Sequence, residues 1–159
     1  MDSAGSAGPD LAGCELFIDF EGNWFHRGSR ITRPEILEEL CARLDLARDG
    51  LYVLLGEKGR CVLEVADTPL VIARVDLSRS ETGAERIELR LKHVPGPEIL
   101  DPSTLEVGKD NVLYCRVRGG RIPARFLRPA YYQLAEFIEE DADTKGFHVK
   151  LNGTVYPVS

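Results

Sequence analysis

Apolar and polar residues alternate in short runs along much of this sequence, a pattern typical of antiparallel β-strands. The clearest run is 87–91, where three apolar residues alternate with Glu88 and Arg90. Such alternation predicts a strand with one buried face and one wet face. We expect further strands at residues 16–18, 24–26, 51–55, 61–65, 70–75, 112–117, 147–151 and 154–156. Tight turns join the strands between residues 51 and 93, which predicts an antiparallel meander. Hairpins are expected around Gly22-Asn23 and Asn152-Gly153, and a helical turn is expected around residues 102–105.

Two segments have the spacing of amphipathic helices. Thr32 and Glu35 have the sequence of a capping box, and Pro34 stands in the first turn, where its missing N–H is tolerated. Apolar residues then recur at helical spacing, so we expect a helix over residues 33–46. A second helix is expected to begin near Arg128-Pro129. Its expected buried residues are Tyr131, Leu134, Ala135 and Ile138.

The two helices have similar surroundings in the sequence. Residues 30–34 (Arg-Ile-Thr-Arg-Pro) and 125–129 (Arg-Phe-Leu-Arg-Pro) each precede a helix, a glycine and a strand pair. Repeated units usually pack together, because neither alone can bury its apolar face. We therefore predict an α+β protein of two hairpin–helix–hairpin units, residues 14–80 and 81–159, packed as one compact protein. The alternative is that the similarity between the two segments is coincidental. Residues 1–13 are expected to be a disordered tail.

Composition narrows the class of protein. The 159-residue chain is 43% apolar and carries a net charge of −6, so it can form a core but lacks the cationic surface that nucleic acids and anionic membranes require. Residues 1–13 lack the basic start and apolar run of a signal peptide, and we expect a cytoplasmic protein. The cysteines lack metal-site spacing and are expected to be reduced, mostly buried thiols, with a disulfide pair as the alternative. They are Cys14, Cys41, Cys61 and Cys115.

The sequence lacks the motifs of common enzymes. It has no Gly-x-Ser-x-Gly elbow, no His-Glu-x-x-His pair and no glycine-rich loop followed by Lys-Ser or Lys-Thr. We therefore expect no catalytic residues, no metal and no cofactor, and we favour a non-enzymatic protein. An enzyme whose residues converge only in the fold is the remaining alternative.

Positive charge is concentrated between residues 111 and 135, which contain five arginines and no acidic residue. These arginines are Arg116, Arg118, Arg121, Arg125 and Arg128. Guanidinium groups bind phosphate or carboxylate with two hydrogen bonds, and a residue at a helix start lies where anions are favoured. One hypothesis is an anion site formed by Arg116, Arg118 and Arg128, with Tyr132 or Trp24 nearby. The alternative is ion pairing with the acids that follow, Glu136, Glu139, Glu140, Asp141 and Asp143.

A second candidate group contains Trp24, His26, Arg33 and Lys58. Trp24 and His26 lie two residues apart on an expected strand, so they share a face that could stack a nucleotide base. In the alternative interpretation, Trp24 anchors the core and His26 is an ordinary surface residue.

Several blocks of the sequence resemble an uncharacterised bacterial family, a domain of unknown function. The most specific block runs from Arg116 to Gly119 and continues through residues 124–129 to 132–134, and the resemblance covers nearly everything from Glu15 onward. Other matching blocks are residues 22–28, 31–40, 49–52, 57–58 and 65–69. The sequence differs from the family pattern at Lys92-His93 and at Leu55-Gly56.

The resemblance implies a duplicated core whose second half is superficially like a pleckstrin-homology domain. It also implies a nucleotide-like ligand at the interface of the halves and a role in signal transduction. Together these features predict a binding or regulatory module for a nucleotide-like or phosphorylated small molecule. A protein-interaction adaptor without a small-molecule ligand is the alternative.

Overall fold

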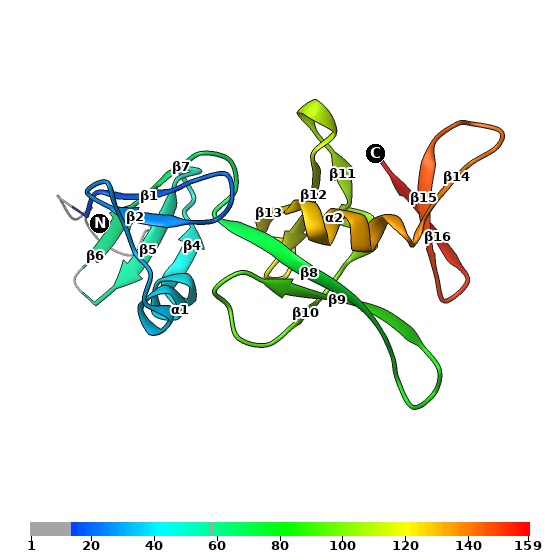
Figure 1. Ribbon diagram of the computed structural model, residues 1–159, viewed down its shortest axis with the longest axis horizontal. Helices are drawn as coiled ribbons and strands as arrows, with labels where there is room; N and C mark the ends of the chain where they lie inside the picture. Colours follow the sequence, from blue (N-terminus) through cyan, green and yellow to red (C-terminus); the bar gives the residue numbers. More distant parts are fainter. Residues whose placement is uncertain (1–13, 58) are drawn as a thin grey trace. The chain divides into compact units, whose positions relative to one another are not determined.

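The computed structural model describes residues 14–57 and 59–159. The protein is α+β, with mostly antiparallel sheets and, in the described residues, two α-helices. The chain divides into two compact units, Met1–Leu70 (unit 1) and Val71–Ser159 (unit 2) (Figure 1). The sequence placed the boundary at residue 80. The structure divides earlier because strand β8 (Leu70–Arg79) pairs along its length with β9 (Glu85–Leu91). The expected tail, residues 1–13, lies outside the described residues.

Unit 1 contains two small sheets and helix α1. The first sheet has the strand order β3-β2-β1-β7, formed by Ser29–Arg30, Trp24–His26, Leu16–Ile18 and Glu64–Val65. Strands β1 and β2 form the expected antiparallel hairpin, and β7 pairs with β1 in parallel. The second sheet is antiparallel, with the order β4-β5-β6, formed by Leu44–Leu46, Tyr52–Gly56 and Gly59–Val62.

The expected meander over residues 51–93 is wrong. Strands β5 and β6 belong to one sheet, β7 joins the sheet of β1, and β8 and β9 belong to a third sheet. Tight turns predict pairing only between neighbouring runs, whereas β7 pairs with a strand much earlier in the sequence.

Helix α1 spans Pro34–Arg43 and is shorter than the expected range 33–46. Residues 44–46 form strand β4 instead, because ladder hydrogen bonds to β5 replace those of a further helical turn. The expected capping box is not formed. Arg33 is the N-cap and has no side-chain cap hydrogen bond; its Nε donates to Glu35 Oε1 at 3.1 Å.

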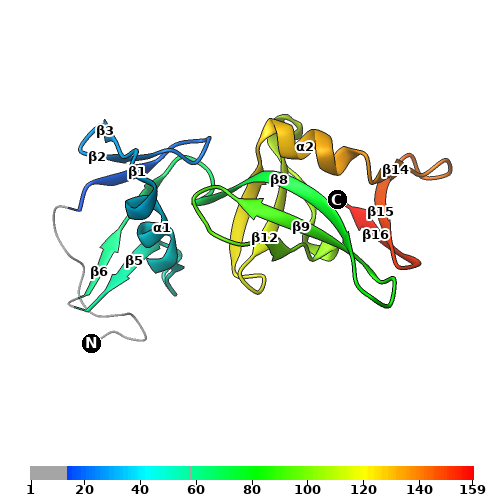
Figure 2. The ribbon, with the colours of Figure 1, turned by 60° about the horizontal axis from the view of Figure 1, so that its bottom comes forward.

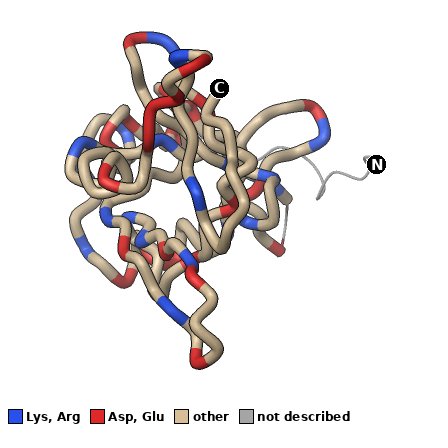
Figure 3. Tube along the Cα trace, turned by 90° about the vertical axis from the view of Figure 1, so that its right-hand side faces the viewer, with Lys and Arg blue, Asp and Glu red and all other residues tan. Residues whose placement is uncertain are grey.

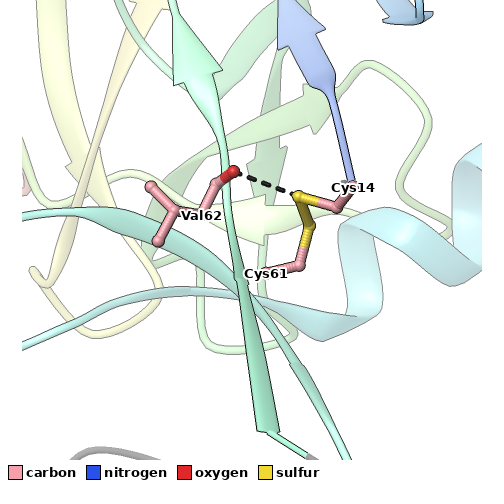
Figure 4. Close-up of a disulfide and its surroundings, with 3 residues drawn as sticks. All are labelled: Cys14, Cys61 and Val62. Carbon is pink, nitrogen blue, oxygen red and sulfur yellow. Dashed lines mark hydrogen bonds between the residues drawn. A yellow bond between two sulfur atoms is a disulfide. The ribbon is translucent and has the colours of Figure 1, made fainter. Parts of the chain in front are cut away.

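A disulfide joins Cys14, which precedes β1, to Cys61 in β6 and so links the two sheets of unit 1 (Figure 4). The expectation of a reduced thiol is wrong for this pair, whose members are 47 residues apart; Cys41 and Cys115 are free and buried, as expected. Cys14 Sγ lies 3.2 Å from the carbonyl oxygen of Val62. Because a disulfide sulfur carries no hydrogen, this contact becomes a hydrogen bond only on reduction. Disulfides are rare in the reducing cytosol, so the cytoplasmic location stays a prediction.

Unit 2 is built on a six-stranded sheet of order β10-β9-β8-β13-β12-β11. The strands not yet given are Glu98–Ile99 (β10), Ile122–Phe126 (β13), Leu113–Val117 (β12) and Glu106–Val107 (β11). Short 3-10 turns at Pro102–Thr104 (η1) and Lys109–Asn111 (η2) precede β11 and β12, and the first is the helical turn expected there. Strand β13 was not expected from the sequence. It forms because it pairs with β12 across the Gly119-Gly120 turn.

Helix α2 (Arg128–Ala135) follows β13 and leads to an antiparallel sheet of order β14-β15-β16, formed by Ile138–Glu140, Phe147–Leu151 and Thr154–Val158. Figure 2 shows α2 running from the six-stranded sheet toward these strands. The expected Asn152-Gly153 hairpin is present, and both turn residues have positive φ (52° and 81°), which this dipeptide tolerates. Leu134 is buried as expected, whereas Tyr131 is 37% exposed and Ile138 lies in β14.

Each unit contains a helix followed by a three-stranded antiparallel sheet: α1 with β4–β6, and α2 with β14–β16. Both helices have a proline in the first turn, Pro34 and Pro129. This order of elements agrees with the expected repeat, and a common origin of the units stays a prediction. No helix in the described part of the chain combines the length and apolarity required to span a membrane.

Reduction of the Cys14–Cys61 disulfide should destabilise unit 1. A cross-link over 47 residues restricts the unfolded chain, which corresponds to about 4 kcal/mol in the chain-entropy treatment. Trp24 is the single tryptophan and is buried in unit 1, so its fluorescence reports unfolding of this unit. We expect a lower guanidinium midpoint in the presence of reductant. Cys14→Ser is the control, since reductant should not shift its midpoint. An unchanged wild-type midpoint would contradict the prediction.

The two free thiols should be unreactive in the folded protein. Burial, together with the nearby carboxylates of Glu98 and Asp101, raises the pKa of Cys115 to about 12; Cys41 is only 1% exposed. The thiolate is the reactive form, so Ellman's reagent should modify neither residue at neutral pH without denaturant. In guanidinium it should titrate both free cysteines. Rapid modification of either thiol in the folded protein would contradict this expectation.

Candidate functional site

Alternation along the β12–β13 hairpin determines which arginines face outward. One side of the hairpin is buried, and its residues are Leu113, Cys115, Val117, Ile122, Ala124 and Phe126. Successive side chains of a strand point to opposite faces, so Tyr114, Arg116 and Arg125 lie on the other side. The strand register places Tyr114 directly opposite Arg125.

A pocket of about 390 Å³ lies where this hairpin meets α2, and we call it the arginine pocket. Strand β13 contributes Arg125, and α2 contributes Arg128, Tyr131 and Tyr132. The two tyrosine rings are in edge contact, with centroids 5.6 Å apart. The other lining residues are Asp110, Asn111, Val112, Leu113 and Phe126. The pocket therefore combines two cations, one acid and two aromatic rings.

A second pocket, of about 430 Å³, adjoins the first, and we call it the apolar pocket. Asn111, Leu113 and Tyr131 line both pockets. The remaining lining residues are Val107, Ala135, Ile138, Phe147 and Val158. The two pockets thus adjoin one another within unit 2, and we call the pair the depression, with charge at one end and apolar side chains at the other.

The turn before β12 shapes the wall that the pockets share. Asp110 and Asn111 both have left-handed φ (59° and 61°), a conformation that Asp and Asn tolerate better than other non-glycine residues. A Cβ on Gly108 would lie 2.6 Å from Cε2 of Tyr114. Glycine at this position therefore lets the turn pack closely against the Tyr114 ring.

The acids that follow α2 form no ion pair with Arg116 or Arg128 within the described residues. Within the described residues, the side chains of Arg116 and Arg128 form no ion pair. Asp141 and Glu139 instead approach His148, with Oδ1 of Asp141 2.6 Å from Nδ1 and Oε1 of Glu139 3.7 Å from Nε2. The shorter approach is not aligned as a hydrogen bond. The ion-pair alternative for Arg116 and Arg128 thus finds no support in the geometry.

The structure brings two of the predicted ligand residues together, because Arg128 and Tyr132 both line the arginine pocket. Arg116 and Arg118 lie in the same unit but line neither pocket. The backbone N–H of Arg116 donates to Thr104 Oγ1 at 3.1 Å. The backbone N–H of Arg118 donates to Glu98 Oε1 at 2.6 Å. The position of Arg125 was missed because strand β13 was missed, although Arg125 belongs to the acid-free cluster.

The second candidate group lies in unit 1. Trp24 is 1% exposed, which agrees with the interpretation of this residue as a core anchor, whereas His26 is exposed at the end of β2. Arg33 is exposed and pairs with Glu35. Lys58 lies outside the described residues.

Two basic side chains and one acidic side chain line the arginine pocket. Acidic and basic residues are interspersed along the chain (Figure 3). The chain has a net charge of −6, whereas Arg125 and Arg128 line the same pocket and make it locally cationic. Among the described residues, no group of three or more His, Cys, Asp or Glu side chains is arranged to hold a metal ion.

Solved structures identify the fold. One protein from Silicibacter pomeroyi, a DUF1285 family protein, superposes with a TM-score of 0.76 over 95% of this chain and 82% of its own, at 20% identity. Another DUF1285 family protein, from Shewanella baltica, has a TM-score of 0.62 over 77% of this chain and 91% of its own, at 18% identity. No protein-family model and no curated protein matches the sequence. The chain therefore has the fold of DUF1285 proteins, in agreement with its resemblance to a domain of unknown function.

Proposed function

We propose that this chain is a non-enzymatic binding module whose arginine pocket holds an anionic small molecule. The convergence of Arg125 and Arg128 beside two tyrosine rings carries the proposal. Guanidinium groups pair with carboxylate or phosphate oxygens through charge-assisted hydrogen bonds. A volume of about 390 Å³ falls within the range of small-molecule sites.

The electrostatics of the pocket favour an anion. Arg125 and Arg128 supply two positive charges and Asp110 supplies one negative charge, so the lining carries a net charge of +1. Arg128 is the first residue of α2, where the helix dipole adds to the attraction. The Arg128 side chain is exposed and forms no ion pair within the described residues, so an anion that binds this side chain does not displace an existing ion-pair partner of Arg128.

Membership of the DUF1285 family is part of the same proposal, supported by the shared fold and by the sequence resemblance. The resemblance implied a nucleotide-like ligand between the halves and a role in bacterial signalling. We place the ligand within unit 2 instead, with a phosphate at the two arginines and a base or other ring against Tyr131 or Tyr132.

Loss of either pocket arginine should weaken anion binding roughly ten- to hundredfold, because a hydrogen bond to a charged group contributes about 1.5–3 kcal/mol. The test is a thermal-shift screen with inorganic phosphate, AMP and carboxylates, followed by calorimetry on Arg125→Ala and Arg128→Ala.

Arg116→Ala is the matched control, since it removes one exposed arginine of the same cluster that lines neither pocket. We expect its affinity to equal that of the wild type. Equal weakening by Arg116→Ala and Arg128→Ala would mean that general charge, rather than the pocket, attracts the anion. The absence of any binding anion would overturn the proposal and favour the protein-interaction adaptor.

A further inference from the structure

We infer that the ligand is a single-chain amphiphile, with an anionic head at Arg125 and Arg128 and an apolar chain in the apolar pocket. This inference rests on the proposed function, because it identifies the class of anion that the arginine pocket would bind. It is carried by the junction of the two pockets at Asn111, Leu113 and Tyr131.

Five strands and helix α2 of unit 2 contribute apolar side chains to the apolar pocket. Val107 comes from β11, Leu113 from β12 and Ala135 from α2, while Ile138, Phe147 and Val158 come from β14, β15 and β16. Asn111 and the Tyr131 hydroxyl are the polar side-chain groups of this lining. A polar ligand group without a hydrogen-bond partner there would lose solvation without compensation, so the lining favours a hydrocarbon chain over a sugar or a peptide backbone.

The apolar lining remains accessible to solvent. Val107 is 43% exposed, Phe147 is 48% exposed and Tyr131 is 37% exposed. Covering such side chains with a hydrocarbon chain removes apolar surface from water on both partners, which is favourable. Exposed apolar side chains around a concave pocket are a recognised sign of a ligand-binding groove.

Helix α2 connects the two ends of the depression. Arg128, Tyr131 and Ala135 are spaced by three and four residues, so they follow one face of the helix. With a rise of about 1.5 Å per residue, this face extends about 10 Å from the cation to the small Ala135 side chain. An elongated molecule with its charge at one end matches this arrangement.

The charge of the lining limits the head group. With a net charge of +1 from Arg125, Arg128 and Asp110, the arginine pocket complements a carboxylate or a singly charged phosphate ester. A free fatty acid and a lipid in a bilayer share this chemistry. We assign the free molecule, because the apolar pocket is concave and lies within unit 2, and the chain as a whole is acidic.

Calorimetry on the full chain with butyrate, hexanoate, octanoate and decanoate tests the inference, each below its micelle concentration, with AMP alongside. We expect affinity to increase up to about fourfold for each added methylene, which corresponds to complete burial at about 0.8 kcal/mol each. Ala135→Leu should abolish this dependence by filling the apolar pocket, and Phe147→Ser should reduce it. Val155→Ser is the matched control and should retain it, because Val155 is an exposed apolar residue outside both pockets.

The outcomes separate the inference from the proposed function. Binding of AMP or butyrate that depends on Arg128, with no gain from chain length, would overturn the amphiphile and leave the anion-binding module intact. Loss of all anion binding would overturn both. Binding to vesicles that contain anionic phospholipid, without binding of monomeric decanoate, would overturn the assignment of a free ligand.

Discussion

Burial of one face of the β12–β13 hairpin is the constraint on which the candidate site depends. Because Ile122, Ala124 and Phe126 are buried, Arg125 must point to the opposite face, and the chain leaves the strand directly into α2 with Arg128 in its first turn. A slip of one residue in this strand would turn Arg125 into the core. Burying the Arg125 charge in the core would cost free energy, so the packing of unit 2 determines where the cationic pocket lies.

Local sequence patterns predicted those parts of the fold that depend on neighbouring residues. The β1–β2 hairpin, the Asn152-Gly153 turn and the start of α2 at Arg128 all formed as expected. Patterns failed where distant pairing decides the structure. Residues 44–46 continue the apolar spacing of α1 but pair with β5, and the Cys14–Cys61 disulfide joins residues 47 positions apart. Strand β13 was not predicted because it contains Pro123, and a proline argues against a strand in a sequence pattern.

The candidate site was only partly predictable for the same reason. The acid-free arginine cluster and the start of α2 indicated Arg128 and Tyr132, and both line the arginine pocket. No local sequence pattern predicted the apolar pocket, because Val107, Phe147 and Val158 come from three different strands. In the sequence, each of them is an ordinary strand residue. Only the folded arrangement shows that a charged end and an apolar end adjoin, and this arrangement supports the proposal of an amphipathic anion.

The most direct measurement is an NMR titration of ¹⁵N-labelled protein with monomeric decanoate. Binding at the depression predicts saturable shifts of the backbone amides of Asn111, Arg128, Tyr131 and Ala135, which come from the turn and helix that line it. The amide of Trp24, buried in unit 1, should stay unshifted. Shifts concentrated in unit 1, or no saturable shift at the four pocket residues, would contradict the account.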